Sequence, residues 1–248
     1  MYPMVGGFVC LIGSLALLMW SRNGASSYAV SETTPDLQPP VAHDPRTLAD
    51  YRWMSRMTLF SAWAAFAIVR SQFALLFIGF GYSESKFGVY LTLFALFNFA
   101  TLTASGRWVF WHFRLVPLIV AQLMLGASLL MIVYGRTLSV FYPSAVVLGL
   151  AFGFAYSSHL YYGASMSRKR SVRMAIHEMV ISLGTIIGAG TGGYLAKNLG
   201  PYVPYWFAIA IIGIGGFLQL IIHGVSLKKT VATGQQVVDR SGMLREPG

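Results

Sequence analysis

The sequence predicts an all-α, polytopic membrane protein with seven transmembrane helices, and three observations support this class. The chain of 248 residues is 56% hydrophobic and only 10% charged, whereas soluble domains carry roughly 25% charged residues. Its mean hydropathy is +0.62. Seven apolar stretches approach or exceed the length of roughly 20 residues that a helix needs to cross a bilayer.

The first predicted helix spans residues 3–21, and no positive charge precedes it, so we expect a transmembrane helix rather than a signal peptide. Residues 22–53 are rich in Ser, Thr, Pro and Asp, which is typical of a flexible linker. The polar tail over 225–248 is expected to be disordered. Six further helices are predicted over residues 54–79, 87–106, 115–134, 143–165, 174–196 and 203–224.

The distribution of Lys and Arg predicts the orientation of the chain in the membrane. If the linker is cytoplasmic, fourteen of the 18 basic side chains lie on the cytoplasmic side. Three lie outside, at Lys86, Arg136 and Lys197, and Arg70 lies within a span. The positive-inside rule therefore places the N-terminus outside and the C-terminus in the cytoplasm of a plasma or inner membrane. This topology explains the net charge of +10 without a nucleic-acid partner.

Several classes of enzyme and cofactor protein lack their required residues. Cys10 is the one cysteine, which excludes an intramolecular disulfide and a CxxC site. The last predicted helix has no lysine for a retinal Schiff base. His177 and Glu178 are followed by Ile181 where an HExxH zinc motif needs its second histidine. We therefore expect no enzyme activity, no metal and no cofactor.

Two segments resemble the major facilitator superfamily (MFS). Gly106 and Arg107 open a basic turn that ends at Arg114 and resembles the signature G-x-x-x-D-R-x-x-x-R, with Phe110 in place of the aspartate. The helix over 174–196 carries a glycine row that resembles the glycine-rich eleventh helix of that family. The row consists of Gly184, Gly188, Gly192 and Gly193, and small residues at this spacing equally allow close helix packing.

The resemblance implies that the chain corresponds to helices 6 to 12 of a twelve-helix transporter. Residues 1–21 would then belong to a missing N-terminal half, 22–53 would form a cytoplasmic linker, and 54–224 a six-helix bundle with three-plus-three inverted repeats. It implies secondary transport of a small-molecule substrate, with proton coupling as one option. The partners would be the lipid bilayer and the missing half or a second copy. The alternative is a scaffold or assembly factor on the same fold that does not transport.

Arg70 is the one charged residue deep inside a predicted span, where a charge costs about 2.5–3.5 kcal/mol on insertion scales. Trp63, Phe66, Phe73 and Phe77 share its face at helical spacing, so aromatic rings are expected around the cation. Under the family mapping, Arg70 faces the substrate cavity. Alternatively, its side chain extends to the outer membrane surface.

Three further residues are candidates for the substrate cavity. Asn98 belongs to a polar stripe on the helix over 87–106, which suits either a water-filled path or hydrogen bonds between helices. Tyr156 and His159 share one face of the helix over 143–165. Because histidine titrates near neutral pH, His159 is a candidate proton carrier, and the alternative is a neutral, hydrogen-bonded histidine.

Arg107, Arg114 and Glu178 are candidates for a cytoplasmic gate. All three are predicted near the same membrane surface, so Glu178 is expected to pair with Arg107 or Arg114 in one state of the protein. The alternative for Glu178 is that it only stabilises the N-terminal end of its own helix, where a negative charge is favoured.

Overall fold

A computed structural model of the chain describes residues 45–164 and 170–243. These residues are helical and contain no strand. In chain order, the elements are α2 (Pro45–Ile68), the π-helical turn η2 (Val69–Phe73), α3 (Ala74–Gly79), α4 (Glu84–Arg107), α5 (Leu115–Tyr134), α6 (Leu138–Ala164), α7 (Arg170–Leu199) and α8 (Val203–Met243).

Six helices of the described part are long and apolar enough to cross a membrane, and α2, η2 and α3 together form the first of them. This agrees with the six spans predicted over 54–79, 87–106, 115–134, 143–165, 174–196 and 203–224. The seventh predicted helix, over 3–21, lies outside the described residues. The chain is therefore an all-helical protein with six candidate membrane spans in its described part.

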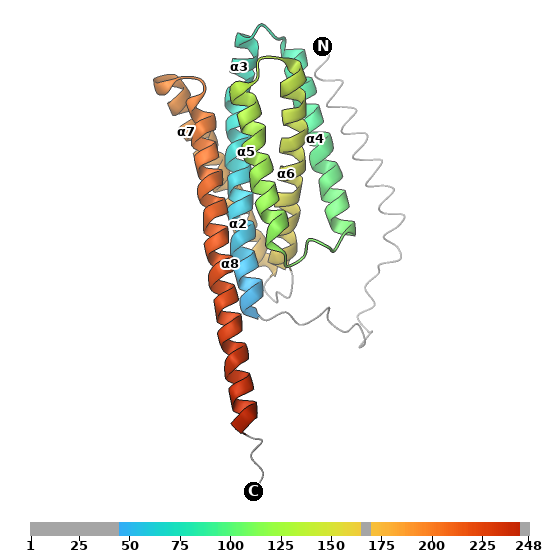
Figure 1. The fold of residues 1–248 in the computed structure, drawn as a ribbon. Helices are drawn as coiled ribbons and strands as arrows, with labels where there is room; N and C mark the ends of the chain where they lie inside the picture. The colour runs from blue at the N-terminus through green and yellow to red at the C-terminus, as the bar shows by residue number, and fades with distance from the viewer. Residues whose placement is uncertain (1–44, 165–169, 244–248) are drawn as a thin grey trace.

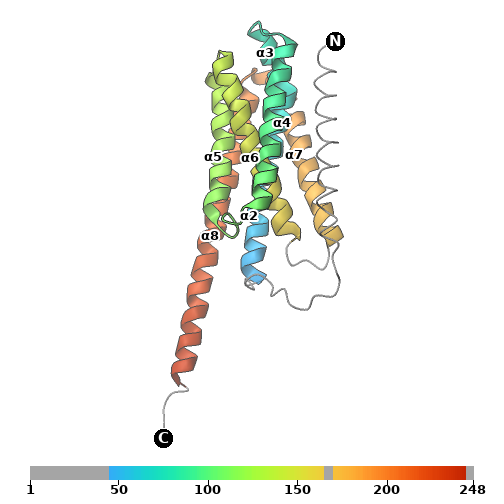
Figure 2. The ribbon, with the colours of Figure 1, turned by 90° about the vertical axis from the view of Figure 1, so that its right-hand side faces the viewer.

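The helices run side by side in two layers (Figures 1 and 2). The order α4, α6, α2, α7 forms one layer, because α4 packs on α6, α6 on α2 and α2 on α7. Helices α5 and α8 form the second layer behind α6 and α2, and they pack on each other. Helix α2 is central, with contacts to α5, α6, α7 and α8.

Two helix limits differ from the sequence prediction by nine residues or more, and the others differ by at most five. Helix α2 begins at Pro45, nine residues before the expected limit, so the end of the predicted linker is helical. Proline suits the first turn of a helix, where its missing N–H is not needed. Helix α8 continues to Met243, through most of the tail that we expected to be disordered. No proline stands between Pro204 and Pro247 to end it.

The glycines of α7 lie at its closest approach to α2. A Cβ atom at Gly184 would stand 2.8 Å from Trp63 Cβ, and one at Gly188 would collide with the carbonyl oxygen of Ala64. Gly192 meets Ile68 Cγ1 at 3.1 Å. Gly193 has more room, with Gln72 Nε2 at 3.8 Å.

A second glycine pair, which the sequence reading missed, joins α6 to α4. Cβ atoms at Gly149 and Gly153 would lie 2.5 Å from the carbonyl oxygens of Phe94 and Asn98, respectively. Their four-residue spacing was the available signal, because small residues at this spacing let two helix backbones approach. Both outer contacts of this layer, α7 on α2 and α4 on α6, therefore depend on glycine residues.

Two buried clusters fill the interior. Toward the α3–α4 turn, the Phe73 ring packs edge-on against Phe77, Tyr90 and Phe141, with centroid distances of 5.4, 5.0 and 5.0 Å. The other cluster includes Tyr51, Trp111 and Tyr162.

The turn between α4 and α5 is held at Phe113, a non-glycine residue with φ of 53°. The Tyr51 hydroxyl donates to the Phe113 carbonyl at 2.7 Å, and the Phe113 N–H donates to the Tyr162 hydroxyl at 2.9 Å. These two bonds fix the turn against α2 and α6.

Candidate functional site

The layer formed by α4, α6, α2 and α7 has one face opposite α5 and α8 that no other described helix covers, and we call it the front face. Only 11% of the apolar stretch of α4 and 17% of that of α7 are buried, against 50% for α6. The two flanking helices therefore present most of their surface to something outside the described chain, either lipid or another helical bundle.

A pair of buried histidines bridges α6 and α7 at the end of the bundle where α2 begins. His159 Nδ1 and His177 Nδ1 lie 2.8 Å apart, and both side chains are buried. The Tyr156 ring packs edge-on against His177 at 4.8 Å. In such a contact one Nδ1 carries a proton and donates, while the other accepts. His177 Nε2 is buried without a hydrogen-bond partner among the described residues.

Three arginines approach this histidine pair. Arg52, Arg56 and Arg173 line one narrow crevice together with Ser55 and His159. Arg52 Nε donates to the Tyr162 carbonyl at 2.9 Å, and the Arg56 guanidinium lies 4.8 Å from the centre of the Trp53 ring. We call this group, consisting of Arg52, Arg56 and Arg173, the arginine cluster.

The sequence reading did not single out the arginine cluster as a site. The available signal was the four-residue spacing of Arg52 and Arg56, which puts both on one side of a helix. Because helix α2 was predicted to start at residue 54, Arg52 was assigned to a linker. The approach of Arg173 from α7 depends on tertiary packing and has no local sequence signal.

An aromatic group lies farther along α2, between the histidine pair and Arg70. Phe66 stacks on Phe94 at 4.4 Å, and Trp63 packs edge-on against Phe152 at 5.0 Å. Among these rings, Trp63 Nε1 is buried and has no hydrogen-bond partner in the described residues.

Asn98 presents the same feature on α4, because its Oδ1 is also buried and unpartnered in the described part. Buried polar atoms without partners are rare and often mark functional or hydrated sites.

Arg70 lies within the π-helical turn η2, and its side chain is exposed. The ring of aromatic side chains expected around it is not formed. Phe73 and Phe77 are fully buried in the core, and no cation–π contact of Arg70 occurs in the described part of the chain. The π turn changes the 3.6-residue periodicity that placed Phe73 and Phe77 on the face of Arg70. Trp63 and Phe66, which precede the turn, pack instead against Phe152 and Phe94.

The three residues considered for a gate, Arg107, Arg114 and Glu178, are all exposed. No ion pair joins Glu178 to either arginine within residues 45–164 and 170–243. The pairing was expected in one state of the protein, so it stays a prediction.

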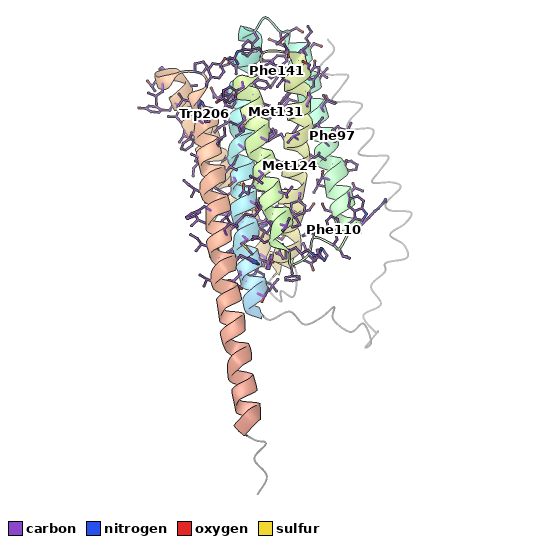
Figure 3. The ribbon with its side chains drawn as sticks, viewed as in Figure 1. Phe97, Phe110, Met124, Met131, Phe141 and Trp206 are labelled. Atoms are coloured by element: carbon purple, nitrogen blue, oxygen red, sulfur yellow. The ribbon has the colours of Figure 1, made fainter. Side chains whose placement is uncertain are left out.

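An apolar groove of about 630 Å³ separates α4 from α5 and has α6 as its floor. Phe97, Phe110 and Met124 line it, and Figure 3 shows these side chains. Its polar side chains are few, among them Thr101 and Ser105. The groove offers hydrophobic contact and little that could orient a polar ligand.

The chain is similar to two bacterial multidrug resistance proteins. It is 32% identical over 147 residues to multidrug resistance protein 2 of Bacillus subtilis (strain 168), a match that covers 58% of this chain and 36% of that protein. It is 25% identical over 141 residues to multidrug resistance protein 1 of the same organism, with 56% and 36% covered. No protein-family model matches the sequence.

The match spans little more than a third of the length of each of these relatives. Together with the six candidate spans, it supports a multi-pass membrane protein related to transport. The two relatives thus support the prediction of membrane transport.

Proposed function

We propose that the chain is part of an MFS-type secondary transporter that moves small, drug-like molecules out of the cell by alternating access. The similarity to multidrug resistance proteins is the observation that carries this proposal. Six candidate spans in residues 47–226 suit the six-helix C-terminal bundle of such a transporter, in which substrate binds between two bundles that move against each other.

The front face is the surface that we assign to the second bundle. Its flanking helices, α4 and α7, are the least buried of the six spans, as expected if a partner covers them in the working protein. That partner is an N-terminal half, to which residues 3–21 belong, or a second copy of this chain.

Four residues are proposed to meet the substrate: Arg70, Asn98, Tyr156 and His159. Their support is of different kinds. Arg70 is exposed in the π turn, which leaves its guanidinium available to an anionic or strongly polar group. Asn98 has a buried Oδ1 without a partner among the described residues. Tyr156 packs on the histidine pair, and His159 is one member of that pair.

The histidine pair is proposed to carry the coupling proton. When both rings are neutral, one Nδ1–H donates to the other Nδ1 across 2.8 Å. A proton added to the accepting Nδ1 leaves two donors facing each other, so the bond between α6 and α7 is lost. Protonation would thereby favour separation of these two helices, and the pair titrates as a unit.

The gate and the orientation complete the proposal. Glu178 would pair with Arg107 or Arg114 when the cytoplasmic side closes, an exposed contact of about 0–1 kcal/mol that biases an equilibrium. The N-terminus would lie outside and the C-terminus in the cytoplasm of the plasma or inner membrane, following the positive-inside rule.

Ethidium efflux from pump-deficient bacteria tests the proposal. Cells would express the chain alone, or together with the N-terminal half of multidrug resistance protein 2. We expect energy-dependent efflux above background when the two are combined, or from the chain alone if it dimerises. Background efflux from every combination, with the chain present in the membrane, would favour the alternative function of a scaffold or assembly factor.

A further inference from the structure

A second apolar groove lies away from the front face, between α7 and α8, with α2 at its base. Its volume is about 470 Å³, and most of its walls are aliphatic or aromatic: Phe60, Val180, Leu183, Ile211, Ile214 and Leu218. Leu183 and Ile214 are 44% and 61% exposed, so the groove opens sideways, toward the acyl chains of a surrounding bilayer.

One end of this groove is strongly basic. Arg56 lines both the groove and the neighbouring crevice of the arginine cluster, so the two cavities are neighbours at this residue. Arg173 stands on the other side of that crevice. No acidic side chain lines either cavity in the described part of the chain, and Glu178, the one acidic residue of α7, is exposed.

The aromatic residue at the same end also suits a membrane surface. Trp53 lines the groove and lies under the Arg56 guanidinium at 4.8 Å. Tryptophan is enriched at the level of lipid headgroups because its ring is apolar and its N–H is polar. The groove therefore has one end where an aromatic and a cationic side chain lie together, and its remainder is apolar. A phospholipid likewise changes from an apolar acyl chain to a charged phosphate along its length.

We propose that this groove is a binding site for one anionic phospholipid, with an acyl chain between α7 and α8 and the phosphate at Arg56 and Arg173. Guanidinium groups bind phosphate through paired, charge-assisted hydrogen bonds. A free phosphate would use the arginines and leave the groove empty, and a zwitterionic lipid would fill the groove without offsetting the cluster of positive charge. Only an anionic lipid matches both the apolar part of the groove, through its acyl chain, and the arginines at the end, through its net negative charge.

The test uses the full 248-residue chain, purified without lipid in an uncharged detergent. Native mass spectrometry would measure retention of phosphatidylglycerol, phosphatidylcholine and inorganic phosphate at matched concentrations. We expect one phosphatidylglycerol to bind at least about tenfold more tightly than phosphatidylcholine, and inorganic phosphate to compete poorly. Equal retention of the two lipids, or full displacement by inorganic phosphate, would overturn the proposal.

Matched variants separate the two ends of the site. Arg56→Gln and Arg173→Gln should each remove most of the preference for phosphatidylglycerol, while Arg114→Gln, at an exposed arginine outside both cavities, should not. Leu183→Trp should fill the groove and weaken both lipids, whereas Ile186→Trp, on the same helix but outside the groove, should not. Because Leu183 is partly exposed, this variant tests the groove without disturbing the buried core. Unchanged lipid selectivity in both arginine variants would contradict the proposal.

Discussion

Arg70 is the residue whose substitution we expect to affect substrate binding most directly. Its exposed guanidinium in η2 is proposed to bind an anionic or strongly polar substrate group, and a hydrogen bond to a charged group is worth about 1.5–3 kcal/mol. In the assembled transporter, Arg70→Ala should therefore weaken binding of a small aromatic sulfonate by about tenfold or more, and Arg70→Lys should weaken it less. Equilibrium dialysis measures this binding.

Ethidium, a cation of similar aromatic character, serves as the control ligand for this test. Its binding should be unchanged or improved by Arg70→Ala, because no positive charge then opposes it. Normal sulfonate binding by Arg70→Ala would mean that the side chain only extends to the membrane surface.

His112, in the turn between α4 and α5, gives a pH prediction outside the membrane spans. Burial lowers the pKa of its imidazole below the ordinary value of 6.5, and the ring stacks on Tyr161 at 3.8 Å. The unfolded chain therefore takes up this proton first, so the stabilising contribution is complete above about pH 6.5 and declines as the pH falls toward the lowered pKa. His112→Tyr should reduce the loss of thermal stability between pH 7 and pH 5. An identical loss in both proteins would show that His112 does not contribute.

At the scale of the helix, the contact between α7 and α2 depends on absent side chains. Gly188→Ala would push a Cβ into the Ala64 carbonyl and to 2.9 Å from Ala67 Cβ, and overpacking of this kind costs about 1–3 kcal/mol. Gly190, on the same helix, has nothing within 4 Å of its Cβ position. Thermal unfolding in detergent should therefore show a lower Tm for Gly188→Ala and an equal or higher Tm for Gly190→Ala. Equal Tm values for the two variants would contradict this packing.

The sequence allowed the spans to be predicted more fully than the site. Apolar length is a local property, so α5 is observed over Leu115–Tyr134, as predicted over 115–134. The π turn at η2 was not predictable from helical periodicity, and Phe73 and Phe77, which follow the start of that turn, are buried in the core and make no cation–π contact with Arg70.

The contact between His159 and His177 could not be predicted from the sequence either, because it depends on tertiary packing. His159 was named as a proton carrier and His177 only as part of a failed zinc motif. Their Nδ1 atoms meet at 2.8 Å because α6 and α7 approach each other, and nothing local in either helix encodes that approach.

At the scale of the whole molecule, the basic asymmetry predicts an external N-terminus and a cytoplasmic C-terminus. Single cysteines at Ser85 and Ser226, in a chain with Cys10→Ser, would report the two sides. A membrane-impermeant thiol reagent should label the cysteine at residue 85 in intact cells, and the one at 226 only after permeabilisation. The reverse labelling pattern would contradict this orientation, and it would place the proposed gate and the anionic-lipid site on the external side of the membrane.

Substrate movement driven by a proton gradient is the central claim, and transport in liposomes tests it most directly. The chain and its partner half would be reconstituted together, and ethidium movement followed by fluorescence after a pH gradient is imposed. The account predicts transport that follows the gradient in the native protein. It also predicts transport that ignores the gradient in His159→Gln and His177→Gln, with His223→Gln behaving as native. Ethidium transport that keeps its full gradient dependence in both histidine variants, or no transport by the native assembly, would contradict it.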